Sequence, residues 1–189
     1  MSMTRINGID VAGISETVDK IKHDPKKARF TLKTETEWIE GCLACTTIKR
    51  GKYGEPDTKK FVIESDEPRS LQGRDTAPNA AEFVLHGLSS CLVVGVAIRA
   101  AVSGIKIEDL KIDLEADIDL RNFFGISKEV RPGFGGVRAK CRMKSDASPE
   151  DIEALFREVV KRSAVMDVIE NEVPVAFEVE VESEDPNSA

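Results

Sequence analysis

The chain has 189 residues, a formal net charge of −7 and a pI near 5.1, and 32% of its residues are charged. This length and balance are typical of one soluble globular domain. The acidic charge argues against a nucleic-acid-binding surface, which needs a basic face. Two histidines exclude a histidine-rich metal site, and four cysteines without an apolar N-terminal export segment indicate free thiols in the cytoplasm.

The first third of the chain predicts a short helix followed by strands. Residues 10–23 place apolar side chains on one stripe of a helix, which Asp24-Pro25 closes. Residues 30–47 have a strand-like pattern with a break at Gly41, and residues 61–64 predict another short strand.

Three segments follow from this pattern. We expect an N-terminal helical extension over residues 1–27, one main domain over residues 28–183 and a disordered tail over residues 184–189. Within the main domain, residues 66–79 show no periodicity and contain several turn-forming residues, so we expect a structured loop there.

The most informative segment is a long apolar helix from Pro78 to Val102. Asn79 is a good N-cap, and Glu82 three residues later fits a capping box. At about 24 residues the helix spans roughly 36 Å. Its few polar side chains predict burial over most of its circumference, and its ionisable residues weaken a membrane-spanning interpretation.

The second half predicts three alternating strands and a helix. Residues 107–120 expose acidic side chains, residues 137–144 expose basic ones, and residues 175–181 expose acidic ones again, each with an apolar opposite face. Opposite charges stabilise neighbouring strands, so we expect the basic strand beside an acidic one, as a neutralised ladder. Ser148-Pro149 predicts the start of a helix, and Cys141 is expected to fill the core.

Two groups of cysteines invite a chemical interpretation. Cys42 and Cys45 have a C-x-x-C spacing, but a zinc site needs a second such pair, and three residues apart in a strand they face opposite sides. Cys91 lies in the middle of the long helix, among small residues that let neighbouring backbones approach. A buried cysteine is usually inert packing, so a special role needs further support.

That support comes from a resemblance. APNAAEFVLHGLSSCLVV is similar to the P-N-P-x-E-x-L-L-x-A-L-x-x-C helix of the OsmC/Ohr family, and SDEPRSLQGRDTAPN is similar to that family's D-E-P-x-x-L-x-G-x-D segment. RPGFGGVRAKCRMKSDASPEDIEAL and RSAVMDVIENEVPV fall where the family has a strand, a second helix and an S/C-P-V…N-x-V-P-V closing motif. The resemblance covers about residues 28–181.

The resemblance implies an α+β, OsmC-like fold in which antiparallel sheets surround long central helices, as an intertwined homodimer with the cysteine sites at its interface. It implies a thiol peroxidase that reduces organic or lipid hydroperoxides in oxidative stress defence, with Cys91 as the peroxidatic nucleophile. The second-cysteine position is Ser163, so the resolving thiol is absent. Either an external thiol reductant replaces it, or turnover is lost. No metal, organic cofactor, nucleic acid or membrane partner is implied.

The family also places a glutamate and an arginine near the sulfur, because a free thiol is only a few per cent thiolate at neutral pH. Glu82 matches the glutamate, although its capping role is an equal alternative. Arg50 is the preferred arginine, with Arg74 as a second candidate. His86, one turn after Glu82, could pair with it or be a hydrogen-bonded core residue.

Two other functions stay open. A non-catalytic protein could hold an apolar ligand, such as a fatty acyl chain, in an interface pocket lined by Phe83, Leu88 and Leu92; the missing resolving cysteine favours this alternative. In a purely structural subunit, Cys91 would be core packing.

Overall fold

The computed structural model describes residues 5–52 and 59–181, except for the side chains of residues 50–52 and 59. Its elements are β1 (Arg5–Ile6), β2 (Ile9–Asp10), α1 (Val11–His23), the 3-10 helix η1 (Pro25–Ala28), β3 (Phe30–Glu40), β4 (Leu43–Lys52), β5 (Lys59–Ser65), the 3-10 helix η2 (Arg69–Leu71), α2 (Ala80–Val102), β6 (Ile107–Ile118), β7 (Phe134–Ser145), α3 (Pro149–Lys161) and α4 (Ala164–Glu170). The expected α+β architecture with antiparallel sheets is confirmed, since β3-β4-β5 and β6-β7 are both antiparallel.

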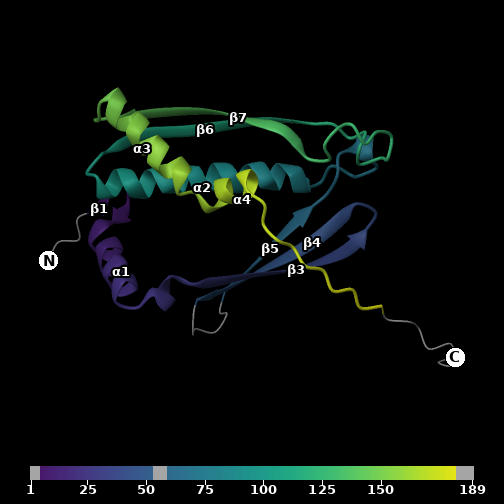
Figure 1. The fold of residues 1–189 in the computed structure, drawn as a ribbon, viewed down its shortest axis with the longest axis horizontal. Coiled ribbons are helices and arrows are strands. Elements are labelled where there is room, and N and C mark those ends of the chain that lie inside the picture. The colour runs from purple at the N-terminus through teal and green to yellow at the C-terminus, as the bar shows by residue number, and fades with distance from the viewer. Residues whose placement is uncertain (1–4, 53–58, 182–189) are drawn as a thin grey trace.

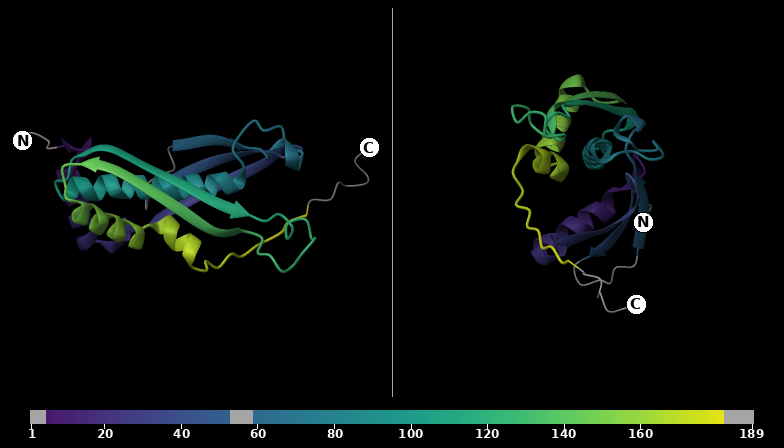
Figure 2. Two further views of the ribbon diagram at one scale, coloured as in Figure 1. Left: turned by 90° about the horizontal axis from the view of Figure 1, so that it is seen from above. Right: turned by 90° about the vertical axis from the view of Figure 1, so that its right-hand side faces the viewer.

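Helix α2 is the central element, running beneath the β6–β7 ribbon with α3 and α4 beside it (Figures 1 and 2). Its expected start is confirmed: the Asn79 carboxamide oxygen accepts from the Glu82 amide, and the Glu82 carboxylate accepts from the Asn79 amide. The helix ends at Ser103 and Gly104, whose φ of +79° is in the left-handed region that favours glycine.

Within the single chain only one stripe of α2 is fully buried, so the expected burial over most of its circumference is not reached by this chain alone. Four buried residues follow the i, i+4 spacing of one helix face, Leu88, Leu92, Val96 and Ala100, and Ala101 is buried beside them. On the opposite face, Val94 is 54% exposed. By length and composition alone α2 could cross a membrane, a test that core helices of soluble proteins also pass.

The core lies where this stripe meets β6, β7, α3 and α4. Leu88, Leu92 and Val96 cluster with Leu155 and Val159 of α3. The two helices approach closely at Gly95, where an added Cβ would lie 2.8 Å from Cγ1 of Val159. The packing therefore fixes α3, and the residues that follow it, against the middle of α2.

The β6–β7 ribbon carries the expected neutralised charge ladder. On its outer face Arg138 pairs with Glu115 at 3.1 Å and with Asp117 at 2.8 Å. Arg142 pairs with Asp113, and Lys144 with Glu108. Cys141, expected in the core, is instead exposed beside a groove between β7 and α3, because α3 does not cover that part of the ribbon completely.

The N-terminal segment contains a small β-hairpin in addition to the expected helix. Strands β1 and β2 form a small hairpin before α1, whose N-cap Asp10 accepts from the Gly13 amide. Asn7 holds this hairpin against the turn between α2 and β6, because its side chain donates to the Ile105 carbonyl at 3.0 Å and accepts from the Ile107 amide at 2.9 Å.

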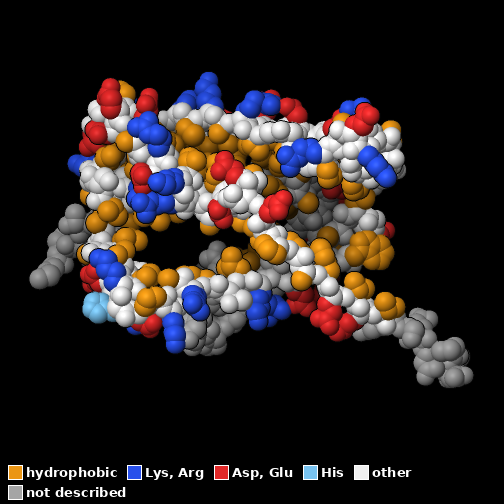
Figure 3. Space-filling model, viewed as in Figure 1, with side chains coloured by type: hydrophobic (Ala, Val, Ile, Leu, Met, Phe, Trp, Pro, Cys, Tyr) orange, Lys and Arg blue, Asp and Glu red, His pale blue; other side chains and the backbone are white. Residues whose placement is uncertain are grey.

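The β3-β4-β5 sheet leaves large apolar side chains uncovered. Its first hairpin turns at Gly41, with a φ of +58°. Phe30, Leu32 and Trp38 are 62%, 78% and 74% exposed. A hollow separates the half of the molecule that contains α2 from the half that contains α1 and β3 (Figure 3).

The expected closing strand does not form within this chain. Residues 171–181 leave α4 and run past the half of the molecule that contains the β3-β4-β5 sheet, without strand pairing (Figures 1 and 2). Their apolar side chains are exposed rather than turned inward: Val173, Val175, Phe177, Val179 and Val181. The alternating pattern is typical of a strand, but a strand needs a hydrogen-bonding neighbour, and this segment pairs with no strand of the described residues. The expected disordered tail over residues 184–189 lies outside the described residues.

The total accessible surface of the chain is 14924 Å². A compact monomer of 20.8 kDa exposes roughly 9,000 Å² by the usual scaling of surface with mass. The surface of the single chain, which includes the residues outside the described ranges, is thus well above that value, and the exposed apolar side chains described above contribute to it.

Candidate functional site

Cys91 lies near the middle of α2 and faces the junction between α3 and α4. Its Sγ is 3.2 Å from the Oγ of Ser163, a hydrogen-bonding distance for sulfur. Cys91 is half-buried, and Ser163 is only 6% exposed. The structure thus brings together the two residues, 72 positions apart in the chain, that the resemblance marks as first and second cysteine positions.

Local chain geometry fixes the position of Ser163. Helix α3 ends at Lys161, and Ser163 is the N-cap of α4. Its hydroxyl oxygen accepts from the Met166 amide at 3.1 Å, and its carbonyl accepts from the Asp167 amide at 3.0 Å. The Ser163 side chain is buried and caps α4, so it has little freedom to turn away from Cys91.

A cavity of about 660 Å³ lies between α2, the β6–β7 ribbon and α4, and neither Cys91 nor Ser163 is among its lining residues. Leu88 and Leu92, two of the three predicted pocket residues, line it, and Leu92 follows Cys91 directly in the chain. Most of the other lining side chains are also apolar: Ala80, Ala81, Val84, Ile118, Phe134, Val137, Ala139, Met166 and Ile169. Arg131 and Glu170 are the charged members of the lining, and nothing in their sequence spacing indicated this position.

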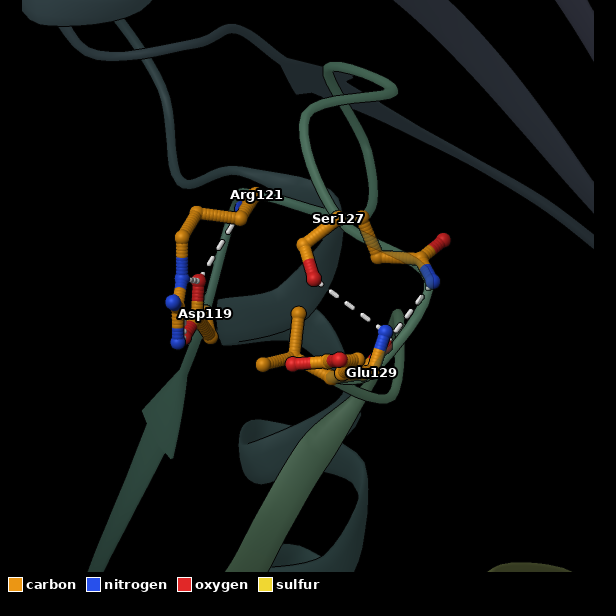
Figure 4. Close-up of polar contacts among 6 residues, drawn as sticks. Asp119, Arg121, Ser127 and Glu129 are labelled. Atoms are coloured by element: carbon orange, nitrogen blue, oxygen red, sulfur yellow. Dashed lines mark hydrogen bonds and ion pairs between the residues drawn. The ribbon is translucent and has the colours of Figure 1, made fainter.

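The loop between β6 and β7 shapes one side of this cavity. Asp119 accepts from the Nε of Arg121 with both carboxylate oxygens, at 3.0 Å each, and the Glu129 amide donates to the Ser127 hydroxyl at 3.1 Å (Figure 4). The Arg121 guanidinium, chiefly through these hydrogen bonds, lowers the pKa of Asp119 to about 2. These contacts brace the loop that leads to Arg131.

Phe83 belongs to a different cavity. It lines a hollow of about 530 Å³ with Pro78, Glu82, Leu85 and His86. Five residues along a helix rotate a side chain by about 140° relative to its starting direction, so Phe83 and Leu88 face different sides. The three predicted pocket residues therefore do not share one pocket within the chain.

Glu82 and His86 do not approach the sulfur within the chain. Nine residues separate Glu82 from Cys91, which places them on opposite faces of α2, and the Glu82 carboxylate is engaged in the capping box. His86 lies 3.5 Å from the Ser90 hydroxyl rather than against Glu82. Any contact of these two residues with a Cys91 sulfur would have to involve a second subunit.

The two candidate arginines lie on or beside the β3-β4-β5 sheet. Arg50 is in β4, opposite Leu32 of β3, and its side chain lies outside the described part of the structure. Arg74 forms an ion pair with Glu40 at the end of β3. Neither is joined to Cys91 by an interaction among the described residues.

The loop from Asp66 to Thr76 is held by one buried carboxylate. Asp66 is 2% exposed and accepts from the amides of Glu67, Arg74 and Thr76 and from the Thr76 hydroxyl. Burial raises the pKa of Asp66, but the hydrogen bonds together outweigh it and lower this pKa below its ordinary value. The motif that resembles the family segment is therefore a rigid connector that leads into α2.

The other cysteines do not form a second site. Cys42 donates a weak hydrogen bond to the Leu71 carbonyl at 3.6 Å, and Cys45 lies in β4 between Glu37 and Glu64. Burial, and then the nearby Asp113, raise the pKa of the Cys141 thiol. All four cysteines are free, and the described residues contain no cluster suited to a metal ion.

Among the four cysteines, Cys91 is therefore the strongest candidate for a reactive thiol, because its sulfur contacts the buried Ser163 hydroxyl and its helix lines an apolar cavity. The sequence indicated the cysteine and the serine position through the resemblance alone. The contact between them depends on how α3 and α4 pack on α2, which no local spacing encodes.

Comparisons with known proteins agree with this architecture. The family described as OsmC-like protein matches residues 73–178, which include both Cys91 and Ser163. An OsmC-like protein from Mycoplasma pneumoniae has a similar fold at 13% sequence identity and a TM-score of 0.53, over 75% of this chain and 87% of that one. An organic hydroperoxide resistance protein OsmC from Legionella pneumophila is similar at 18% identity and a TM-score of 0.51, over 72% and 88% of the two chains. No curated protein sequence matches the chain.

Proposed function

We propose that this chain, which belongs to the OsmC-like family, is a thiol-dependent peroxidase that reduces organic or lipid hydroperoxides through the single cysteine Cys91. The observation that carries the proposal is the Cys91 sulfur, held 3.2 Å from a buried hydroxyl on a helix whose Leu88 and Leu92 line an apolar cavity of about 660 Å³. An apolar cavity suits the organic part of such a peroxide, since apolar surface gains free energy on leaving water.

The first step is attack by the Cys91 thiolate on one peroxide oxygen. A sulfur–oxygen bond forms, the oxygen–oxygen bond breaks, and the departing alkoxide takes up a proton to become an alcohol. The sulfur is thereby oxidised to a sulfenic acid, and the peroxide is reduced by two electrons.

The second step needs a thiol from outside the chain. Ser163 has no sulfur with which to form a disulfide, and the structure brings no other cysteine of the described chain against Cys91. A low-molecular-weight thiol or dithiol condenses with the sulfenic acid to give a mixed disulfide and water. A second thiol then releases reduced Cys91 by exchange and leaves as the reductant's disulfide.

The proposal includes an intertwined homodimer. Its support is the surface of 14924 Å², which exceeds that of a compact monomer by about 6,000 Å². The outer side of α2, one face of the β3-β4-β5 sheet and the segment 171–181 expose apolar side chains that a second copy would cover. Such a dimer is also the arrangement in which Arg50, Glu82 and His86 could serve the Cys91 site of the partner. Sedimentation that gives a monomer mass would contradict it.

The place of action that we propose is the cytoplasm, where thiol reductants are abundant. The partners are then the peroxide, the external thiol and the second subunit.

Consumption of cumene hydroperoxide in the presence of a dithiol tests the function. We expect catalytic loss of peroxide with the wild-type protein and none with Cys91→Ser, while Cys141→Ser, which removes a thiol outside the site, keeps full activity. Inert wild-type protein with Cys91 still reduced after exposure to the peroxide would contradict the proposal.

The same cavity favours a second candidate, a non-catalytic protein that binds an apolar ligand. Its lining is mostly apolar, and Arg131 and Glu170 are its charged side chains. A fatty acid that raises the melting temperature of wild-type and Cys91→Ser protein equally, without any peroxide consumption, would support this function over the peroxidase.

A further inference from the structure

We propose that the Ser163 hydroxyl is a positioning residue for Cys91: it donates a hydrogen bond to the sulfur and favours the reactive thiolate. The inference rests on the proposed function for its biological meaning, but its physical content concerns the thiol alone. It gives the serine at the second-cysteine position an active role instead of treating it as a lost resolving thiol.

In the neutral thiol form either atom of this contact could be the donor, but the other partner of the hydroxyl leaves its proton available to the sulfur. A serine hydroxyl has one donor proton and two acceptor lone pairs. The Met166 amide, which can only donate, occupies one lone pair at 3.1 Å. The hydroxyl proton is left for another acceptor, and the Cys91 sulfur at 3.2 Å is the one that the described structure provides.

Such a bond acts differently on the two forms of the sulfur. A neutral thiol is a weak acceptor and can itself be the donor, whereas a thiolate can only accept. Hydrogen bonds to ionised groups are shorter and roughly twice as strong as those between neutral groups. The contact therefore stabilises the thiolate more than the thiol, and the low exposure of Ser163, 6%, limits competition from water.

No charged side chain of the described residues replaces the Ser163 hydroxyl as a hydrogen-bonding partner of the Cys91 sulfur. On α2 the nearest ionisable side chain toward its N-terminus is His86, which lies against Ser90. At the end of α3, Arg162 is ion-paired with Glu158. On α4, Asp167 accepts from the side chain of Asn171. None of these makes a hydrogen bond to the Cys91 sulfur.

Ser163 also caps α4, so the experiment must separate the cap from the donated bond. Glycine at an N-cap costs a helix only a few tenths of a kcal/mol relative to serine, whereas alanine costs about 1 kcal/mol. Ser163→Gly thus removes the hydroxyl and largely keeps the cap, and Ser163→Thr restores a hydroxyl at the same position. Both variants are made in a background in which Cys91 is the remaining thiol: Cys42→Ser, Cys45→Ser and Cys141→Ser.

The measurement is the rate of alkylation of Cys91 by iodoacetamide as a function of pH, with melting temperatures recorded to confirm folding. We expect Ser163→Gly to react roughly tenfold more slowly near neutral pH, since a change of about 1.4 kcal/mol in the balance of the two forms is a factor of ten, and its pH profile to move upward. Ser163→Thr should recover most of the rate.

Equal pH profiles for wild type and Ser163→Gly, with both proteins folded, would overturn the inference. So would a Ser163→Thr variant that is folded and as slow as Ser163→Gly. Because alkylation needs no peroxide, a wild type that is inert toward cumene hydroperoxide but shows the alkylation effect contradicts the proposed function alone. Peroxide turnover that survives in Ser163→Gly with an unchanged alkylation profile contradicts the inference alone.

Discussion

Placing a second thiol at position 163 should convert the site into a two-cysteine site. In Ser163→Cys the new sulfur would replace an oxygen that lies 3.2 Å from the Cys91 sulfur, and small rotations would bring the two sulfurs to bonding distance. One equivalent of hydroperoxide would oxidise Cys91 to the sulfenic acid, and the second thiol would displace water to form an intramolecular disulfide.

The size of the effect follows from the chain separation. The bridge would close a loop of 72 residues, for which the chain-entropy relation gives about 4 kcal/mol of stabilisation, with 2–4 kcal/mol typical of measured bridges. For a protein of this length, 1 kcal/mol shifts the melting temperature by about 2–4 °C. We expect the oxidised variant to melt about 4–16 °C above its own reduced form.

Mass spectrometry of the peptides under non-reducing conditions identifies the bridge, and thermal melts with and without reductant give its effect. The matched control is Cys91→Ser combined with Ser163→Cys, which has the new thiol but no partner for it and should show neither result. Failure of the folded, peroxide-treated single variant to link positions 91 and 163 would refute the arrangement of α2, α3 and α4 on which the site depends.

Three further predictions concern the frame of the site. Gly95→Ala should destabilise the protein by up to about 2.5 kcal/mol, because overpacking against Val159 costs about 1–3 kcal/mol and alanine regains about 0.5–1 kcal/mol of helix propensity. Urea unfolding measures the change, and additive effects in the double variant with Val159→Ala would contradict a direct clash. Gly73→Ala should disrupt the loop before α2, because the added Cβ would lie 1.7 Å from the Glu67 carbonyl oxygen. Faster hydrogen exchange of the Arg74 and Thr76 amides would report this disruption, and unchanged exchange would contradict the loop geometry. The pKa of Asp119, about 2 in the fold, is below its unfolded value of about 3.9. Its contribution to stability is therefore complete above about pH 4 and is lost as the pH falls through about 2. NMR titration should show this low midpoint and its rise in Arg121→Ala, and a midpoint near 4 in wild type would contradict the ion pair.

The parts of the fold that follow local rules were predictable from the sequence. The Asn79 and Glu82 capping box depends on residues three positions apart, and the turn at Gly41 depends on one residue. The charge ladder of β6 and β7 followed from the sign of alternate side chains, because opposite charges select each other across neighbouring strands.

What depends on tertiary packing was not predictable in the same way. The expected pairing of His86 with Glu82 does not occur, because the carboxylate is already engaged with the Asn79 amide. Phe83 and Leu88 were grouped by hydrophobicity, but the helix rotates them to different sides. Arg131 reaches the cavity through an irregular loop that carries no periodic signal.

Two segments that were expected to be buried are exposed in the single chain. The outer side of α2 and the residues 171–181 have the sequence pattern of buried elements, yet both are exposed in the isolated chain. A sequence specifies which faces are apolar, but it does not say whether the same chain or a second copy covers them.

The central claim is that Cys91 reacts with an organic hydroperoxide, and a single-turnover experiment tests it most directly. Wild-type protein receives one equivalent of cumene hydroperoxide, dimedone then captures any sulfenic acid, and peptide mass spectrometry locates the adduct. We expect a dimedone adduct on Cys91, with Cys42, Cys45 and Cys141 largely unmodified. A Cys91 thiol that stays reduced while the peroxide persists would contradict it.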